Sequence, residues 1–181
     1  MITIDYARIA TAVSYYVGLG YVPTEVPWIV GERAYEVTKP PGAVGFVTLG
    51  GYLVASAEQG FIQLLQGGAK LGKCVAVTPC FRHETYDDLH LPYFMKVELI
   101  ATADVSDTAL TGMIREAEGF FNAYIRTQVI ETHDGYDIAE AVTGIELGSY
   151  GRRQTGDLTW LYGTGLAEPR LAKAIQLSRG V

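Results

Sequence analysis

The sequence predicts an α+β protein in which an antiparallel β-sheet is flanked by helices. Segments with strand-like patterns gather in the middle of the chain, whereas segments with helical periodicity lie near both ends. Strands and helices therefore do not alternate as in βαβ units, which build parallel sheets. The length of 181 residues and the apolar content of 49% suffice for a hydrophobic core. We expect a single domain over residues 1–181.

The N-terminal part predicts a helix, a strand and a hairpin. Asp5 can cap a helix, because apolar residues follow it at every fourth position. Residues 22–30 read as one strand, but Pro23 and Pro27 cannot donate to a β-ladder and place it at an edge. Residues 46–55 hold two short apolar runs around a Gly-Gly pair, which is typical of a hairpin.

The centre of the chain predicts a helix followed by two long strands. Residues 58–71 carry apolar side chains on one helical face. Residues 73–82 and 93–105 read as strands, and the polar residues 83–92 form a long loop between them. We therefore expect these two strands to pair antiparallel.

The C-terminal part predicts two helices with short strands between them. Ser106 or Asp107 caps the first of these helices, which has a wide apolar stripe. The second helix spans residues 167–177 and tolerates Pro169 in its first turn. The strand-like runs between the helices centre on Val129, Ile138, Ile145 and residues 158–162.

The composition excludes several classes of protein. A formal net charge of −6 argues against a protein that binds nucleic acid with its whole surface. Cys74 and Cys80 are too few for a disulfide framework or a four-cysteine zinc site, so we expect buried thiols. No basic segment precedes an apolar run at the N-terminus, and no apolar stretch approaches the ~20 residues of a membrane span. We expect a cytoplasmic protein with no membrane partner.

Charged and aromatic residues gather where the two central strands meet. If these strands pair, one sheet face carries Arg82, Glu84, Phe94, Lys96 and Glu98. Arginine suits carboxylates and phosphates, and an aromatic ring can stack on a base. The alternative is a solvated sheet face with an ordinary ion pair, and from these residues alone the two readings have equal weight.

Two further segments have a possible role in binding. Gly163 and Gly165 lie where a strand is expected to turn into a helix, a place where a ligand can approach the backbone and the helix N-terminus favours anions. Arg170 follows in the first turn of that helix. Ser56 and Glu58 end an apolar run. The simpler alternatives are a glycine turn for the first segment and a helix N-cap for the second.

Together these segments resemble the catalytic core of class II aminoacyl-tRNA synthetases, which carries three motifs. Residues 20–27, ending in a proline, look like the first motif. Residues 81–84 (Phe-Arg-His-Glu) and 90–94 (His-Leu-Pro-Tyr-Phe) match the second, and residues 163–170 match the third. The sequences of these motifs are most similar to those of seryl-type enzymes. The loop between the halves of the second motif, residues 85–89, has instead the length found in phenylalanyl and pyrrolysyl types.

The resemblance implies ATP and Mg²⁺ as cofactors, with the glycines of the third motif in the ATP site. Arg82 would bind the α-phosphate and the amino-acid carboxylate, and Arg170 would bind the γ-phosphate. Glu84 would read the adenine amino group, Phe94 would stack on the ring, and Glu146 would ligate Mg²⁺. Arg82 and Arg170 would be the catalytic residues, acting through position and charge.

The resemblance also implies an amino-acid site and partners. Ser56, Glu58, Arg82 and Glu98 would bind the amino acid, Glu58 through the α-ammonium and Glu98 near the side chain. A carboxylate near the side chain favours a small polar substrate, serine before phenylalanine. The chain would activate an amino acid as its adenylate and transfer it to tRNA or another acceptor, as a homodimer.

Two points on function stay open at this stage. The 181 residues hold no segment resembling an anticodon-binding domain or a tRNA arm, so we expect poor tRNA binding by this chain alone. The alternative to an enzyme is a non-catalytic paralogue that binds an amino acid or a nucleotide as a regulatory module. The presence of both arginines and of Glu84 and Glu146 favours catalysis.

Overall fold

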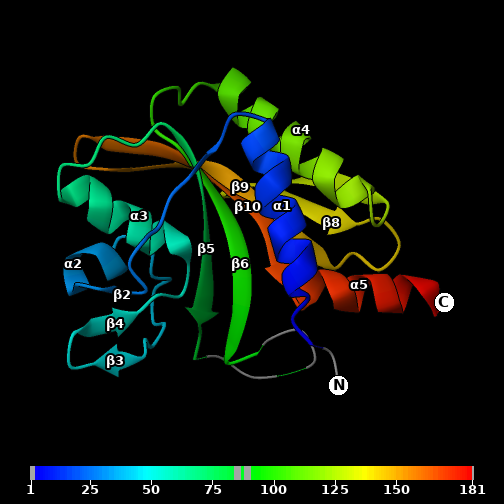
Figure 1. The fold of residues 1–181 in the computed structure, drawn as a ribbon, viewed down its shortest axis with the longest axis horizontal. Helices are drawn as coiled ribbons and strands as arrows, with labels where there is room; N and C mark the ends of the chain where they lie inside the picture. Colours follow the sequence, from blue (N-terminus) through cyan, green and yellow to red (C-terminus); the bar gives the residue numbers. More distant parts are fainter. Residues whose placement is uncertain (1–2, 84–86, 88–90, 181) are drawn as a thin grey trace.

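A seven-stranded sheet forms the centre of the computed structural model, which describes residues 3–83, 87 and 91–180 (Figure 1). The strand order is β1-β5-β6-β10-β9-β8-β7, and only β1 is parallel to its neighbour. In that order the strands are β1 (Val22–Pro23), β5 (Lys73–Phe81), β6 (Tyr93–Ala101), β10 (Leu158–Glu168), β9 (Glu146–Thr155), β8 (Gly135–Glu140) and β7 (Thr127–Thr132). The predicted α+β class with an antiparallel sheet is confirmed.

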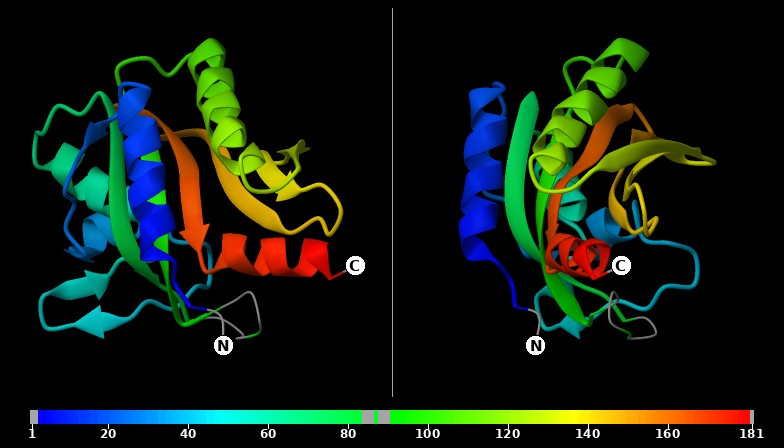
Figure 2. Two further views of the ribbon diagram at one scale, coloured as in Figure 1. Left: turned by 45° about the vertical axis from the view of Figure 1, so that its right-hand side comes forward. Right: turned by 90° about the vertical axis from the view of Figure 1, so that its right-hand side faces the viewer.

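Two long helices cover one face of this sheet. The helices α1 (Tyr6–Gly18) and α4 (Asp107–Asn122) cross it side by side (Figure 1). The main hydrophobic core lies beneath them, with Tyr16, Phe121 and Leu161 fully buried. Another helix, α5 (Arg170–Arg179), extends directly from the end of β10 (Figure 2).

A smaller layer covers part of the other face. It consists of α2 (Glu32–Tyr35), α3 (Ala57–Gln66) and a three-stranded sheet of β2 (Ile29–Val30), β4 (Gly51–Leu53) and β3 (Val47–Thr48). Residues of β5 alternate between the layers, because successive side chains of a strand point to opposite faces. Cys74 and Ala76 pack toward this smaller layer, and Val75 packs under the long helices. The part of this face that the smaller layer leaves open is where a ligand can reach the sheet.

The helix caps follow the predicted residues. The Asp5 side chain accepts from the backbone N–H of Arg8 at 2.9 Å, and Ser106, not Asp107, caps α4 by accepting from Ala109 at 3.2 Å. The predicted hairpin at residues 46–55 is confirmed as β3 and β4.

Four predicted boundaries are wrong. Residues 22–30 form two short strands in different sheets, because the prolines interrupt the ladder. Helix α3 ends at Gln66 instead of residue 71, since Gly67 caps it and Gly68 has a φ of +88°. The strand predicted to reach residue 105 ends at Ala101. The last helix begins at Arg170 instead of 167, because β10 continues to Glu168.

Both cysteines are free and buried, as predicted. Burial raises the pKa of the Cys80 thiol to about 12, so the thiolate is disfavoured. Within the described part of the chain, no helix combines the length and the apolar character needed to cross a membrane.

Candidate functional site

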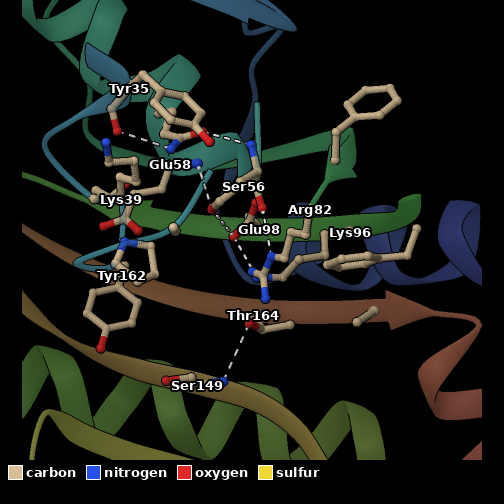
Figure 3. A pocket seen from close by; sticks show the side chains of 18 of the residues that line it. Tyr35, Lys39, Ser56, Glu58, Arg82, Lys96, Glu98, Ser149, Tyr162 and Thr164 are labelled. Carbon is tan, nitrogen blue, oxygen red and sulfur yellow. Dashed lines mark hydrogen bonds and ion pairs between the residues drawn. The ribbon is translucent and has the colours of Figure 1, made fainter. Parts of the chain in front are cut away.

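A cavity of about 550 Å³ opens on the face of the sheet beside the N-terminus of α3 (Figure 3). Its walls come from β5, β6, β9 and β10, the start of α5, and the loop of residues 38–44. This volume falls within the ~300–1,000 Å³ typical of small-molecule sites. Most of the predicted site residues line it: Ser56, Glu58, Arg82, Phe94, Glu98, Glu146 and Arg170. Glu84 lies outside the described residues.

The pairing of β5 with β6 builds one wall of the cavity. Cys80 stands opposite Phe94, and Thr78 stands opposite Lys96. Because side chains alternate along a strand, this register puts Arg82 on the same sheet face as Phe94, as predicted. The Arg82 guanidinium carbon lies 5.1 Å from the centroid of the Phe94 ring, and its Nε donates to the Ala55 carbonyl at 3.3 Å. A flat cation and a flat ring therefore lie next to each other on the cavity wall.

Glu98 lies in a network of hydrogen bonds at the centre of the cavity (Figure 3). Its Oε1 accepts from Ser56 Oγ at 2.6 Å and from Lys96 Nζ at 2.7 Å, and its Oε2 accepts from the Ala57 backbone N–H. Burial alone would raise the pKa of Glu98, but these partners hold it below its ordinary value. Ser56 is also the N-cap of α3, so the predicted helix cap and the predicted site residue coincide.

Glu58 is buried in the first turn of α3 and has two partners of its own. Its Oε1 accepts from Trp160 Nε1 at 2.7 Å, and its Oε2 accepts from Arg153. The Arg153 guanidinium carbon also lies 4.1 Å from the centroid of the Tyr162 ring. Burial raises the pKa of Glu58, and the two partners offset only part of this effect.

Arg170 and Glu146 face each other near the start of α5. Arg170 Nη1 lies 3.3 Å from Glu146 Oε1, and the Glu146 side chain is 48% exposed. Asp137 of β8 lies nearby: burial raises its pKa, and the negative charge of Glu146 raises it further. The pair is therefore accessible to solvent and can be exchanged for contacts with a ligand.

The strand register orders these groups along the sheet. Arg153 stands opposite Trp160, Glu98 opposite Thr164, and Lys96 opposite Ala167, three residues before Arg170. We call one end of the cavity the inner end, which consists of Ser56, Glu58, Lys96, Glu98 and Arg153. We call the other end the outer end, which consists of Arg82, Phe94, Glu146 and Arg170.

Gly163 and Gly165 do not line the cavity, and the predicted strand-to-helix turn is wrong. Both lie inside β10. A Cβ at Gly163 would lie 2.7 Å from the Tyr150 ring, and one at Gly165 would lie 2.7 Å from the Tyr16 ring, both within the main core. These glycines make room for aromatic packing behind the strand that carries Thr164.

Three parts of the site are not predicted from the sequence. Arg153 and Tyr162 line the inner end, and residues 38–44 form a rim. The alternation of β9 and β10 could have shown that both side chains face Glu58, but only once the register was known. In the sequence, residues 38–44 could be recognised only as a loop rich in proline and glycine.

Charge distinguishes the cavity from the rest of the protein. Among the described lining residues, five are cationic and three are carboxylates, whereas the whole chain has a net charge of −6. The cationic ones are Lys39, Arg82, Lys96, Arg153 and Arg170. Such a local excess of positive charge favours an anionic ligand.

Solved structures share this fold. Seryl-tRNA synthetase from Pyrococcus horikoshii, complexed with ATP, matches 94% of the chain with a TM-score of 0.76 at 21% identity. Cytoplasmic serine-tRNA ligase from Naegleria fowleri, in complex with AMP, matches 94% with a TM-score of 0.71 at 17% identity. Pyrrolysyl-tRNA synthetase from Desulfitobacterium hafniense matches 97% with a TM-score of 0.69 at 14% identity.

The chain spans about half the length of the two seryl enzymes, 49% and 47%, and 70% of the pyrrolysyl enzyme. No curated protein sequence matches it. The family model for the class II core domain of tRNA synthetases matches residues 57–181, which include α3, β5, β6, β9, β10 and Arg170. These are the elements that form most of the cavity walls, and the chain belongs to the class II tRNA synthetase core domain family.

Proposed function

We propose that this chain activates an amino acid with ATP to form an aminoacyl-adenylate. The observation that carries the proposal is the pairing of Arg82 with the Phe94 ring on one wall, with Arg170 at the same end of the cavity. A ring and a guanidinium suit a purine and its phosphates. Two proteins with this fold are described as complexes with ATP and with AMP.

The proposed reaction needs no covalent nucleophile from the protein. A carboxylate oxygen of the amino acid attacks the α-phosphorus of ATP, a new P–O bond forms, and the bond to pyrophosphate breaks. Arg82 holds the α-phosphate and the carboxylate, and Arg170 holds the γ-phosphate. Catalysis then comes from positioning and from neutralising the charge of the transition state.

Glu146 suits the proposed role of Mg²⁺ ligand. It is the most exposed of the cavity's three described carboxylates, and the other two are buried and occupied by several donors. Mg²⁺ is commonly held by one or two carboxylates together with substrate phosphates. When bound, the ion would add positive charge at the phosphates.

The inner end is the proposed amino-acid site, with Ser56, Glu58 and Glu98 as its residues and with Arg82 of the outer end reaching the carboxylate. Glu58 is the proposed partner of the α-ammonium, which would share the carboxylate with Arg153 and Trp160. Serine stays the first choice of substrate, because the inner end is polar throughout. The acceptor is proposed to be tRNA or another nucleophile.

A homodimer is proposed on α1 and the two short strands after it. Val17, Leu19, Val22, Trp28 and Ile29 are all at least 39% exposed, so this part of the chain leaves several apolar side chains uncovered. Light scattering at micromolar concentration is expected to give twice the chain mass of 19.7 kDa. A mass near 19.7 kDa would contradict this proposal and leave the activity proposal standing.

The test of the activity is pyrophosphate exchange into ATP, measured with each of the twenty amino acids. We expect exchange that depends on the amino acid and on Mg²⁺. Retained ATP binding without any exchange would instead favour a non-catalytic paralogue that binds nucleotide.

A further inference from the structure

Every carboxylate oxygen at the inner end already accepts at least one hydrogen bond. Each oxygen of Glu98 accepts at least one hydrogen bond, from Ser56, Lys96 or the Ala57 backbone N–H. Each oxygen of Glu58 accepts one, from Trp160 or Arg153. Donors nevertheless remain beside these carboxylates, because a guanidinium carries five N–H groups and an ammonium three.

Arg153 is a donor that its surroundings hold on two sides. Glu58 holds one edge of its guanidinium, and the Tyr162 ring lies against it at 4.1 Å. The Arg153 side chain is nevertheless 39% exposed and lines the cavity. A planar group held on two sides presents its other N–H groups in a constant geometry.

We propose that Arg153 is a specificity-determining residue that donates a hydrogen bond to an acceptor atom of the substrate side chain. The pocket then takes amino acids with a short, uncharged side chain that carries an acceptor, a hydroxyl or an amide. It excludes amino acids whose side chain is an ammonium. This proposal rests on the proposed amino-acid activation and on the amino acid lying at the inner end.

Charge at the inner end supports this selectivity. The Glu58–Arg153 and Lys96–Glu98 pairs are each internally neutral. A side-chain ammonium would add one more cation beside Arg153, Lys96 and the α-ammonium, where the two described carboxylates already have cationic partners. A side-chain carboxylate would instead lie beside Glu58 and Glu98 and meet two like charges.

The structure thus reverses the polarity expected from the sequence. The resemblance places Glu98 near the substrate side chain as an acceptor for a hydroxyl or an amine. In the structure Glu98 is occupied by three donors, and Arg153, which carries no prediction, is the group with donors to spare.

Three substrates of similar size test whether the pocket recognises a side-chain acceptor or a side-chain ammonium: serine, alanine and 2,3-diaminopropionate. The first carries an acceptor, the second carries none, and the third carries an ammonium. Exchange kinetics with each would be measured for the wild type, for Arg153→Met and for Arg153→Lys. Arg152→Met is the matched control, because Arg152 is the neighbouring arginine in β9 but pairs with Asp107 of α4 and does not line the cavity.

We expect the wild type to prefer serine to both other substrates by about tenfold or more in kcat/KM, because only serine gives the charged donor of Arg153 an acceptor. Arg153→Met is expected to abolish the preference for serine over alanine, since any effect that passes through Glu58 is common to all three substrates and cancels in their ratio. Arg153→Lys is expected to restore part of the difference, and Arg152→Met to change nothing.

A second measurement separates this proposal from the proposed activity. Binding of the three aminoacyl sulfamoyl-adenosine analogues is measured by calorimetry, which needs no turnover. The variant Glu58→Gln/Arg153→Met removes both charges together, and it is used if Arg153→Met does not fold.

The outcomes are distinct. If no amino acid supports exchange but the analogues bind in the order expected, the activity proposal fails and the role of Arg153 stands. Tighter binding of the diaminopropionyl analogue, or equal losses for all three analogues in Arg153→Met, would overturn the role of Arg153 alone. Absence of binding by every analogue would overturn both.

Discussion

The carboxylate at the outer end of the cavity is half exposed, whereas the two carboxylates at the inner end are buried. Glu146 at the outer end is 48% exposed and lies 3.3 Å from its arginine, while Glu58 and Glu98 at the inner end are each 8% exposed. Exposed ion pairs contribute little to stability and are easily exchanged for a ligand. Buried pairs are costly to break. The outer end is therefore suited to bind and release, and the inner end to select.

The largest expected effect is at the outer end. Arg82→Ala and Arg170→Ala are each expected to lower amino-acid-dependent exchange by at least about a hundredfold, because each removes a charged contact to phosphate. Circular dichroism should show that both variants remain folded, and Arg152→Ala serves as control. Exchange near the wild-type rate in both folded variants would contradict the assignment of the outer end to ATP.

The next expected effect is a difference in protein stability between substitutions at the two ends. Glu58→Ala is expected to destabilise the fold by about 2 kcal/mol or more, since Trp160 Nε1 and Arg153 lose their acceptor. Glu146→Ala is expected to change stability by less than about 0.5 kcal/mol, because its partner is reached by water. Urea unfolding of both variants measures this. Equal losses would mean that the ends do not differ in the way described.

A third prediction concerns the core behind both ends. Gly165→Ala would bring a Cβ to 2.7 Å from the Tyr16 ring and is expected to destabilise by about 1–3 kcal/mol. Gly112→Ala in α4 meets no atom within 4 Å and is expected to stabilise by about 0.5–1 kcal/mol. Thermal unfolding compares them. A neutral Gly165→Ala would argue that this glycine serves the ligand, as the sequence suggested.

The smallest effect distinguishes the two inner carboxylates by pH. The folded-state pKa of Glu98 is lowered, so its contribution to stability is present above its unfolded pKa and is lost as the pH falls through the folded value. The folded-state pKa of Glu58 is raised, so its cost is absent below the unfolded pKa and grows as the pH rises through the folded value.

From pH 7 to pH 4 the wild type should therefore lose stability relative to Glu98→Gln and gain it relative to Glu58→Gln. Unfolding free energies at the two pH values test this. Shifts of the same sign for both variants would contradict the opposite environments of the two acids.

The sequence predicted the outer end better than the inner end. Arg82 and Phe94 lie on two neighbouring strands, so their grouping followed from the expected pairing of those strands, whereas Arg170 was joined to them through the resemblance to the synthetase motifs. The partners of Glu58 come from β9 and β10, about 100 residues away in the chain. No local pattern gives the register of such distant strands.

The glycines of the third motif show a different limit. Gly163 and Gly165 look like a turn because glycine is common in turns, yet both lie in a strand. Glycine is required at these positions because the rings of Tyr150 and Tyr16 lie directly behind them. Such neighbours are known only once the core is packed. The antiparallel sheet, in contrast, followed from the order of strand-like and helical segments and needed no long-range contact.

Cys80, opposite Phe94 on the cavity wall, has a consequence for experiment. Its side chain is fully buried and its thiolate is disfavoured, so an alkylating reagent can reach it only when the β5–β6 region opens. The rate of labelling at Cys80 therefore reports how often this part of the sheet opens in the native protein. A nucleotide stacked on Phe94 should slow that labelling, which makes the native thiol a built-in reporter of occupancy without any engineered probe.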